Sequence, residues 1–214
     1  MKIVKPGVEF ITPIDGTTIL KRLEECGRVC YKSEDRITED SAPTFVANIL
    51  KRGHEAVLEH CSFTVKFICD RGVSHEIVRH RLASYCQEST RYCNYGKGQF
   101  GKEITVIAPC FLNPDTQAWD EWKTTMANCE YGYFHLLELG CSPQEARSVL
   151  PNSLKTEVVM TANIREWRHF LKLRCSPAAH PQMREVALIL LKEVHTKIPV
   201  LFDDLWDEYG GDSH

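Results

Sequence analysis

The segment that most clearly indicates the fold class is residues 62–69, with the sequence SFTVKFIC. Apolar and polar side chains alternate along it, which is typical of a β-strand with one buried face. Residues 73–83 follow directly, and their apolar side chains recur at helical spacing. A strand that leads into a helix within one short stretch predicts a fold that mixes both kinds of element.

The flanking sequence predicts further elements of both kinds. We expect helices over 17–32, from Ser41 to just before Gly53, over 73–83, 114–139, from Ser142 to just before Pro151, and over 164–174, 181–197 and 199–208. We expect strands over 62–69, 104–107 and 155–162, with a polar, aromatic-rich loop between residue 83 and about residue 102. The order lacks a regular βαβ alternation, which favours an α+β fold over a doubly wound sheet. At roughly 150 residues per domain, the length predicts a single domain spanning 1–214, with mixed helices around a small sheet.

The composition is that of an ordinary folded protein. The chain has 26 Lys and Arg against 29 Asp and Glu, a net charge of −3, and 43% of its residues are hydrophobic. No apolar run approaches the roughly 18 residues that a membrane span requires, and the first residues lack the apolar core of a secretion signal. We therefore expect a soluble, cytoplasmic protein without membrane contact. The ten cysteines contain no CxxC pair, so they predict neither a zinc ribbon nor a disulfide framework.

Two patterns resemble ligand-binding motifs but lack the required context. Residues 96–101 match GxGxxG, yet no buried strand precedes them and no helix follows, so we expect no Rossmann-type dinucleotide site. His54 and His60 are six positions apart, and His75 and His80 are five apart. Histidines that bind zinc from one helix face are four apart. We therefore expect no metal site.

The residues best suited to chemistry lie within 75–92, with the sequence HEIVRHRLASYCQESTRY. On the predicted helix, Arg79, His80 and Arg81 would point about 100° apart. This arrangement suits contact with two ligands, or with a ligand and a neighbouring subunit; the alternative is a solvated basic helix end. The net charge is negative, which favours a local anion pocket over binding to a nucleic acid polymer.

Further arginines and polar side chains strengthen the prediction of an anion pocket. Gln87, Ser89 and Arg91 supply an amide, a hydroxyl and a guanidinium within five residues, a set that suits a phosphate. Arg147 and Arg174 lie in otherwise apolar helical segments, where an arginine either extends its head group to water or pairs with an anion. The residues alone therefore predict an α+β protein that binds phosphorylated small molecules, and they name no reaction.

Arg79-His80-Arg81, then seven residues, then Ser89 resembles the RHR-x7-S motif of flavin-dependent thymidylate synthases. Other segments resemble further blocks of that family, in the same order along the chain. They are GHE at 53–55 with EH at 59–60, STRY at 89–92, ARSVLP at 146–151, NIR at 163–165 and FLKLR at 170–174. An ordered set of blocks is far more specific than one short motif.

The resemblance implies the fold of that family and an enzyme that makes dTMP from dUMP. The carbon donor would be methylenetetrahydrofolate, the redox cofactor FAD and the reductant NADPH, in a homotetramer whose active sites are shared between subunits. No protein nucleophile is implied, so the cysteines need no catalytic role. Two other hypotheses remain open: a nucleotide-binding module without enzymatic activity, and an RNA-binding protein.

The resemblance also implies roles for individual residues. It implies that dUMP is bound by Glu76, Ile77, Val78, Arg79, Gln87, Glu88, Ser89, Thr90, Arg91, Arg147 and Arg174. It implies that FAD is bound by Ala56, Arg79, His80, Arg81, Gln87, Asn163, Ile164, Arg165 and His169. His54 and Glu59 would line the flavin and folate region. Arg174 would be catalytic, because a permanently charged guanidinium can polarise the uracil ring and stabilise negative charge on it. Ser89 would position dUMP rather than attack it.

Overall fold

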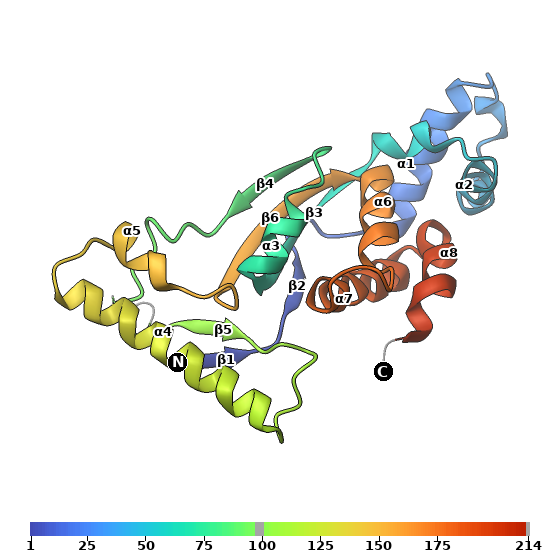
Figure 1. Ribbon diagram of the computed structural model, residues 1–214. Coiled ribbons are helices and arrows are strands. Elements are labelled where there is room, and N and C mark those ends of the chain that lie inside the picture. The colour runs from blue at the N-terminus through green and yellow to red at the C-terminus, as the bar shows by residue number, and fades with distance from the viewer. Residues whose placement is uncertain (97–100, 213–214) are drawn as a thin grey trace. The chain divides into compact units, whose positions relative to one another are not determined.

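The structure is a computed structural model that describes residues 1–96 and 101–212, with strands and helices in mixed order (Figure 1). The chain divides into two compact units. Unit 1 comprises Met1–Gly7, Phe67–Arg79 and Tyr85–Val159. Unit 2 comprises Val8–Lys66, His80–Ser84 and Met160–His214. Each unit is therefore assembled from segments that are far apart in the sequence.

Four strands form a sheet in the order β2–β3–β6–β4. They are β2 (Gly7–Phe10), β3 (Ser62–Asp70), β6 (Lys155–Asn163) and β4 (Ala83–Gln87). The alternating residues of β3 put Phe63, Val65, Phe67 and Cys69 on the buried face, as the pattern at 62–69 predicts.

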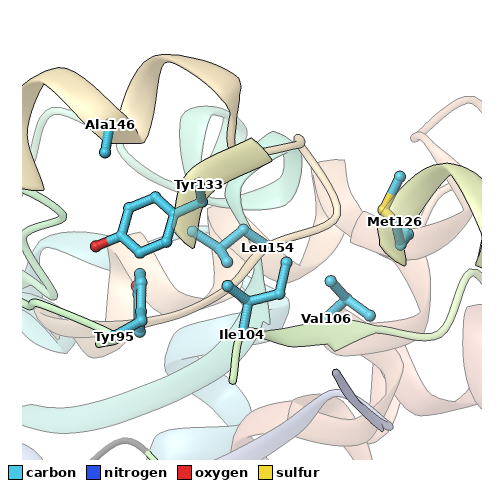
Figure 2. Close-up of a cluster of buried hydrophobic side chains, with 7 residues drawn as sticks. All are labelled: Tyr95, Ile104, Val106, Met126, Tyr133, Ala146 and Leu154. Atoms are coloured by element: carbon cyan, nitrogen blue, oxygen red, sulfur yellow. The ribbon is translucent and has the colours of Figure 1, made fainter. Parts of the chain in front are cut away.

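Unit 1 is built on a second, two-stranded sheet. Strand β1 (Lys2–Val4) pairs in parallel with β5 (Thr105–Ile107), with Ile3 opposite Val106. Helix α4 (Gln117–Glu138) packs against this pair through a buried cluster (Figure 2). The cluster consists of Tyr95, Ile104, Val106, Met126, Tyr133, Ala146 and Leu154. The unit also contains the short helices α3 (Arg71–Ile77) and α5 (Pro143–Ala146), the latter continued by a 3-10 turn at Arg147–Val149.

Unit 2 is mainly helical. Its α-helices are α1 (Gly16–Val29), α2 (Ser41–Lys51), α6 (Ile164–Arg174), α7 (Pro181–Lys197) and α8 (Pro199–Tyr209). Its 3-10 helices are Glu34–Arg36, Glu55–His60 and Gly210–Asp212. Trp167 of α6 is fully buried; its ring stacks on Phe63 at 4.9 Å between centroids, and its Nε1 donates to the Phe63 carbonyl oxygen at 3.2 Å. This contact fixes α6 against strand β3.

The α+β class is confirmed, and so are most of the predicted elements. Helices α6 and α7 have the predicted bounds, and α2, α8, β5 and β6 agree within a few residues. The helix predicted over 114–139 begins later, at Gln117, because the Thr116 side chain accepts a hydrogen bond from Trp119 N and caps it. The predicted single domain of 1–214 stays a prediction.

The helix predicted over 73–83 is confirmed as far as Ile77 and is wrong beyond it. Helix α3 ends at Ile77, and residues 83–87 form strand β4 in place of the predicted loop. The apolar pattern misled because Leu82 carries it onward although its side chain is 76% exposed. From Ala83 the burial alternates residue by residue, which is the period of a strand. The predicted 100° separation of Arg79, His80 and Arg81 on a helix is therefore wrong as well.

Smaller differences have local causes. Helix α1 ends at Val29 rather than at residue 32, where Lys32 adopts a positive φ of 48°. Strands β1 and β2 were not predicted, because neither is longer than four residues. Residues 97–100 of the GxGxxG match lie outside the described residues. Within the described ranges, no helix combines the length and the apolar character needed to cross a membrane.

Candidate active site

The Arg79-His80-Arg81 segment follows α3 as non-helical chain, and its three side chains alternate in burial. Arg79 and Arg81 are exposed, whereas His80 is only 5% exposed. Residues 78 and 79 form a turn, in which the Arg79 backbone N–H donates to the Glu76 carbonyl oxygen at 3.2 Å. The motif therefore presents two guanidinium groups to the surface and directs an imidazole into unit 2.

His80 lies between two polar side chains of α6. Its Nδ1 is 3.1 Å from Oε1 of Glu166, which is itself buried, and its Nε2 accepts a hydrogen bond of 3.1 Å from Nε of Arg174. The imidazole packs on Phe170 at 4.8 Å and meets His169 edge-on at 5.8 Å between ring centroids. Two motif blocks that are 94 positions apart thus form a direct contact.

The surroundings of His80 favour its neutral form. Burial lowers the pKa of His80, and the positive charge of Arg174 and the neighbouring His169 lower it further. The hydrogen bond and negative charge of Glu166 oppose this shift without reversing it. The imidazole is therefore uncharged at neutral pH, because its pKa lies below the ordinary value of about 6.5.

A pocket of about 710 Å³ opens beside α6. Its lining includes Glu59, Leu82, Asn163, Arg165 and His169, which bring predicted flavin residues together. The Arg165 guanidinium bonds to Glu59 Oε1 at 2.6 Å and lies 3.4 Å from Glu55 Oε2. These side chains are about half exposed, so the ion pairs hold the shape of the pocket and contribute little stability.

A second, smaller pocket of about 410 Å³ contains the other predicted residues of this region. It is lined by Tyr31, His54, Ala56 and Arg165, among others, and it shares Glu55 and Arg165 with the first pocket. The Tyr31 hydroxyl and His54 Nδ1 share a hydrogen bond of 2.7 Å. His54, Glu59, Ala56 and Arg165 therefore line one continuous region of unit 2.

In unit 1, the predicted dUMP residues follow strand β4. The Gln87 amide donates to Ser74 Oγ at 2.9 Å and to Thr156 Oγ1 at 3.4 Å, and both hydroxyl residues are fully buried. Gln87 therefore fixes the end of β4 against α3 and β6. Its amide is engaged with protein groups in this structure.

Glu88 is held in a network of its own. It accepts from the Tyr95 hydroxyl at 3.0 Å and from Lys155 Nζ at 3.3 Å, and Lys155 also bonds to Glu157 at 2.5 Å. Burial raises the pKa of Tyr95, and the adjacent Glu88 raises it further. The Lys155 pKa is raised as well: burial opposes the charged form, but the two carboxylates outweigh it. The network anchors the backbone on both sides of Ser89.

The Ser89–Arg91 segment carries the groups that suit an anion. Thr90 is buried, and its hydroxyl accepts from Arg147 Nη1 at 3.2 Å across 57 positions of sequence. Ser89 Oγ accepts from the backbone N–H of Arg91 at 3.3 Å. The exposed Arg91 guanidinium lies over the Tyr92 ring at 5.5 Å. Two guanidinium groups and a hydroxyl in one unit can bind a phosphate by charge and hydrogen bonds.

The remaining predicted residues lie at the end of α3 and at the start of α6. Glu76 and Ile77 end α3, and Val78 follows them. The Ile77 side chain is fully buried and its carbonyl oxygen accepts from the Tyr85 hydroxyl at 3.0 Å. Ile164 is fully buried too, and its backbone N–H bonds to the Cys61 carbonyl oxygen at 2.9 Å. Both isoleucine side chains belong to the core of their units, so only their backbones are available to a ligand.

Sequence reasoning missed several partners of the motif residues. They are Tyr31, Glu55, Ser74, Lys155, Thr156 and Glu166. Glu55 and Glu166 had usable signals. Glu55 is the last residue of the GHE block at 53–55, and Glu166 stands four positions before Phe170 and eight before Arg174, on one face of the correctly predicted helix 164–174. The other four lie outside the motif blocks, in segments whose contacts depend on the fold.

Comparisons with known proteins agree with the motif blocks. Residues 14–200 match the protein family described as Thy1, "Thymidylate synthase complementing protein". Proteins named flavin-dependent thymidylate synthase are similar to this chain in Pyrococcus furiosus (34% identity, 85% of this chain and 74% of the relative) and in Corynebacterium glutamicum (31%, 92% and 83%). The relative in Geobacter sulfurreducens is 33% identical over 83% of this chain and 78% of its own.

A solved structure supports the fold. The UMP/dUMP methylase PolB from Streptomyces cacaoi, bound with 5-Br dUMP, aligns over 100% of both chains with a TM-score of 0.77 and 22% identity. The fold implied by the motif blocks is confirmed. The chain belongs to the Thy1 family, whose members named above are the flavin-dependent thymidylate synthases.

Proposed function

We propose that this protein catalyses the reductive methylation of dUMP to dTMP as a flavin-dependent thymidylate synthase. Methylenetetrahydrofolate would donate the carbon, FAD would be the redox cofactor and NADPH the reductant. One observation carries the proposal: motif arginines bond to partners from distant motif blocks. The pairs are Arg147 with Thr90, Arg174 with His80, and Arg165 with Glu59, at separations of 57, 94 and 106 positions.

The residues of unit 1 support a site for the phosphate of dUMP. Arg147 and Arg91 supply positive charge, and the Ser89 and Thr90 hydroxyls supply hydrogen bonds. Gln87 and Glu88 support the segment through their own networks, so their side chains position the backbone as well as any ligand. Residues 76–79, at the end of α3 and just after it, complete the proposed set.

The larger pocket of unit 2 fits part of a flavin. It combines apolar Leu82 and Leu205 with the hydrogen-bonding groups of Asn163 and His169, a mixture that suits a fused ring with polar edges. FAD in its reduced form supplies the hydride that the reaction requires. Ala56 would contact FAD, and His54 and Glu59 would line the flavin and folate region.

The diphosphate of FAD needs further cations. The pocket lining contains more acidic than basic residues: Glu55, Glu59, Glu166, Asp204 and Glu208 against Arg165, Arg168 and Lys172. Arg79 and Arg81 are exposed whereas His80 is buried, so the two arginines suit contact with a ligand held on a neighbouring subunit. This arrangement supports the proposal of a homotetramer with shared active sites.

Arg174 is the proposed catalytic residue. Its guanidinium would bond to the uracil ring of dUMP, favour loss of the N3 proton and stabilise the negative charge that develops on the ring. No protein nucleophile is needed, because the ring is activated at C5 by this charge. We further propose that the reaction takes place in the cytoplasm.

The experiment is a visible absorbance spectrum together with release of tritium from dUMP labelled at C5. We expect a yellow protein that releases tritium when it is given methylenetetrahydrofolate and NADPH. Arg174→Ala should lose this turnover at least about 10²-fold, the size of effect seen when one transition-state charge donor is removed, with an unchanged mass in solution. A colourless protein that binds dUMP without releasing tritium would be a nucleotide-binding module instead.

A further inference from the structure

The Glu166–His80–Arg174 contacts determine where the protons lie. An arginine Nε–H can only donate, so Nε2 of His80 must be the unprotonated acceptor of the 3.1 Å bond from Arg174. The proton of a neutral imidazole is then on Nδ1, which faces the Glu166 carboxylate at 3.1 Å. The three side chains therefore define one tautomer of His80 and one direction of hydrogen bonding.

The helix that carries Arg174 provides the frame for this arrangement. Glu166, Phe170 and Arg174 are four positions apart along α6, so they share one face, and the imidazole of His80 lies against it. Asn163 Oδ1 accepts from the Glu166 backbone N–H at 2.9 Å and caps the first turn of α6, which contains Glu166. His80 and Glu166 are each only 5% exposed, which leaves little room for either side chain to change rotamer.

A bond to Nε orients the whole guanidinium group. The group is planar, and its five N–H donors have fixed directions relative to one another. Once the Nε–H direction is set, the directions of the Nη1 and Nη2 donors are set as well. An acceptor on Nε therefore determines where Arg174 can place charge on a ligand.

We propose that His80 is a positioning residue that aims the Arg174 guanidinium at the substrate by accepting its Nε–H, with Glu166 holding the imidazole in the required tautomer. This inference deepens the proposed function and rests on it, because it concerns how the proposed catalytic arginine is held. It differs from the flavin contact that the motif resemblance implies for His80. A contact role acts on affinity for FAD, whereas a positioning role acts on turnover once every site is filled.

The test uses two amide variants of His80. A glutamine amide oxygen reaches the position of Nε2 and can accept from Arg174, whereas an asparagine amide reaches only the position of Nδ1 and can donate to Glu166. We expect His80→Asn to lower kcat for tritium release by about 10²-fold at saturating FAD and dUMP, the loss typical of a misplaced catalytic group. His80→Gln should recover most of the kcat that His80→Asn loses, since it keeps the acceptor that matters.

Other outcomes overturn the inference. If both variants regain full kcat when FAD is in excess, His80 is a flavin contact and not a positioning residue. If both lose kcat equally at saturation, the acceptor on Nε2 is irrelevant. The proposed function is judged separately, by tritium release from the unchanged protein and its loss in Arg174→Ala. If the unchanged protein is inactive, both the function and this inference fail.

A pH profile gives a readout that a purely structural role would not change. The charged or titratable groups that affect the pKa of His80 include Glu166, His169 and Arg174, which all lie on α6. Protonated His80 cannot accept from Arg174, so kcat should fall as the pH drops below about 6.5, through the lowered pKa of His80. His80→Gln should lack this fall. Glu166→Gln keeps the shape of the Glu166 side chain and serves as a second variant if His80→Asn fails to fold. It should move the fall in kcat to lower pH, because Glu166 raises the pKa of His80. An unchanged pH profile in Glu166→Gln contradicts the inference.

Discussion

Arginines in the motif blocks are held by different kinds of acceptor, and this sets how much charge they offer a ligand. Arg165 is paired with two carboxylates, Glu59 and Glu55, which offset its charge. The Arg147 bond goes to the neutral hydroxyl of Thr90. A guanidinium held by a neutral acceptor keeps its full attraction for an anion. Arg147 therefore suits the phosphate, and Arg165 suits the uncharged part of a ligand.

Removal of the Thr90 hydroxyl should weaken dUMP binding. Thr90→Val keeps the shape of the buried side chain but removes the acceptor for Arg147 Nη1. One such hydrogen bond contributes about 1 kcal/mol, so we expect the KM for dUMP to rise about fivefold with little change in kcat. Steady-state tritium release measures both constants. Thr44→Val, at an exposed position of α2, is the control, and an unchanged KM in Thr90→Val would contradict the role of Arg147.

Tyr95 should make the protein less stable in alkali. Burial raises the pKa of Tyr95, so the unfolded chain ionises near pH 10 while the folded protein keeps the phenol neutral. The unfolded state then binds fewer protons, and the free energy of unfolding falls as the pH rises above about 10. Urea unfolding at pH 8 to 11 should show a shallower fall in Tyr95→Phe than in the unchanged protein. Equal slopes would mean that Tyr95 ionises freely in the folded state.

At the scale of elements, the end of α4 shows how one substitution can have opposite effects in a single helix. Gly132 lies inside α4, where a new Cβ would meet Val149 at an ordinary 3.7 Å. Gly140 follows the helix with φ +92°, a conformation that other residues rarely adopt, although the space around it is open. A side chain at Gly140 would therefore cause strain through the backbone conformation and not through contact with neighbouring atoms.

We expect Gly132→Ala to raise the free energy of unfolding by about 0.5–1 kcal/mol, because alanine loses less entropy in a helix. Gly140→Ala should lower it by about 1 kcal/mol, because alanine disfavours positive φ. Urea titration of each variant beside the unchanged protein gives both values. Changes of the same sign would show that α4 ends differently from the way its cap indicates.

The accuracy of sequence prediction followed the strength of the local signals. Helices α6 and α7 were predicted with correct bounds because proline or a capping residue precedes a clear apolar face. Strand β4 was missed because its pairing with β6, more than sixty residues away, overrode a weak helical pattern. Strand β1 has three residues, too few to show a period.

The site shows the same division between local and distant information. Motif spacing identified the arginines, but it could not identify Glu166 as a partner of His80, or Ser74 and Thr156 as partners of Gln87. These partners come from other elements, and only folding brings them into contact. The resemblance to the family also placed Ile77 and Ile164 in ligand sets, although their side chains are fully buried in the structure.

At the scale of the whole molecule, the proposed sharing of active sites can be tested by mixing. Arg147→Ala alters unit 1 and Arg174→Ala alters unit 2. Each variant alone should be nearly inactive, because both arginines belong to the proposed active site. If each active site of the tetramer takes the two arginines from different subunits, unfolding and refolding an equal mixture should restore part of the activity. Mass measurement by light scattering should give a tetramer throughout. A mixture as inactive as its components would contradict shared sites.

The interleaved order of the two units has a further effect on the design of truncations. Unit 1 begins at Met1 and is complete only at Val159, and unit 2 draws on two segments within that span and one segment after it. A single continuous fragment therefore cannot contain one unit without part of the other. Variants that keep the full chain are the appropriate reagents for every test above.

The pairing of Ile3 with Val106 also determines when the first strand can find its place during protein synthesis. A ribosome adds roughly 5–20 residues per second, so β1 must wait about 5–20 s for β5 to emerge. In that interval its backbone hydrogen-bonding groups have no strand to pair with, and such edges are prone to join other chains. The nascent protein is then most vulnerable to aggregation, and slower translation of this region would prolong the exposure.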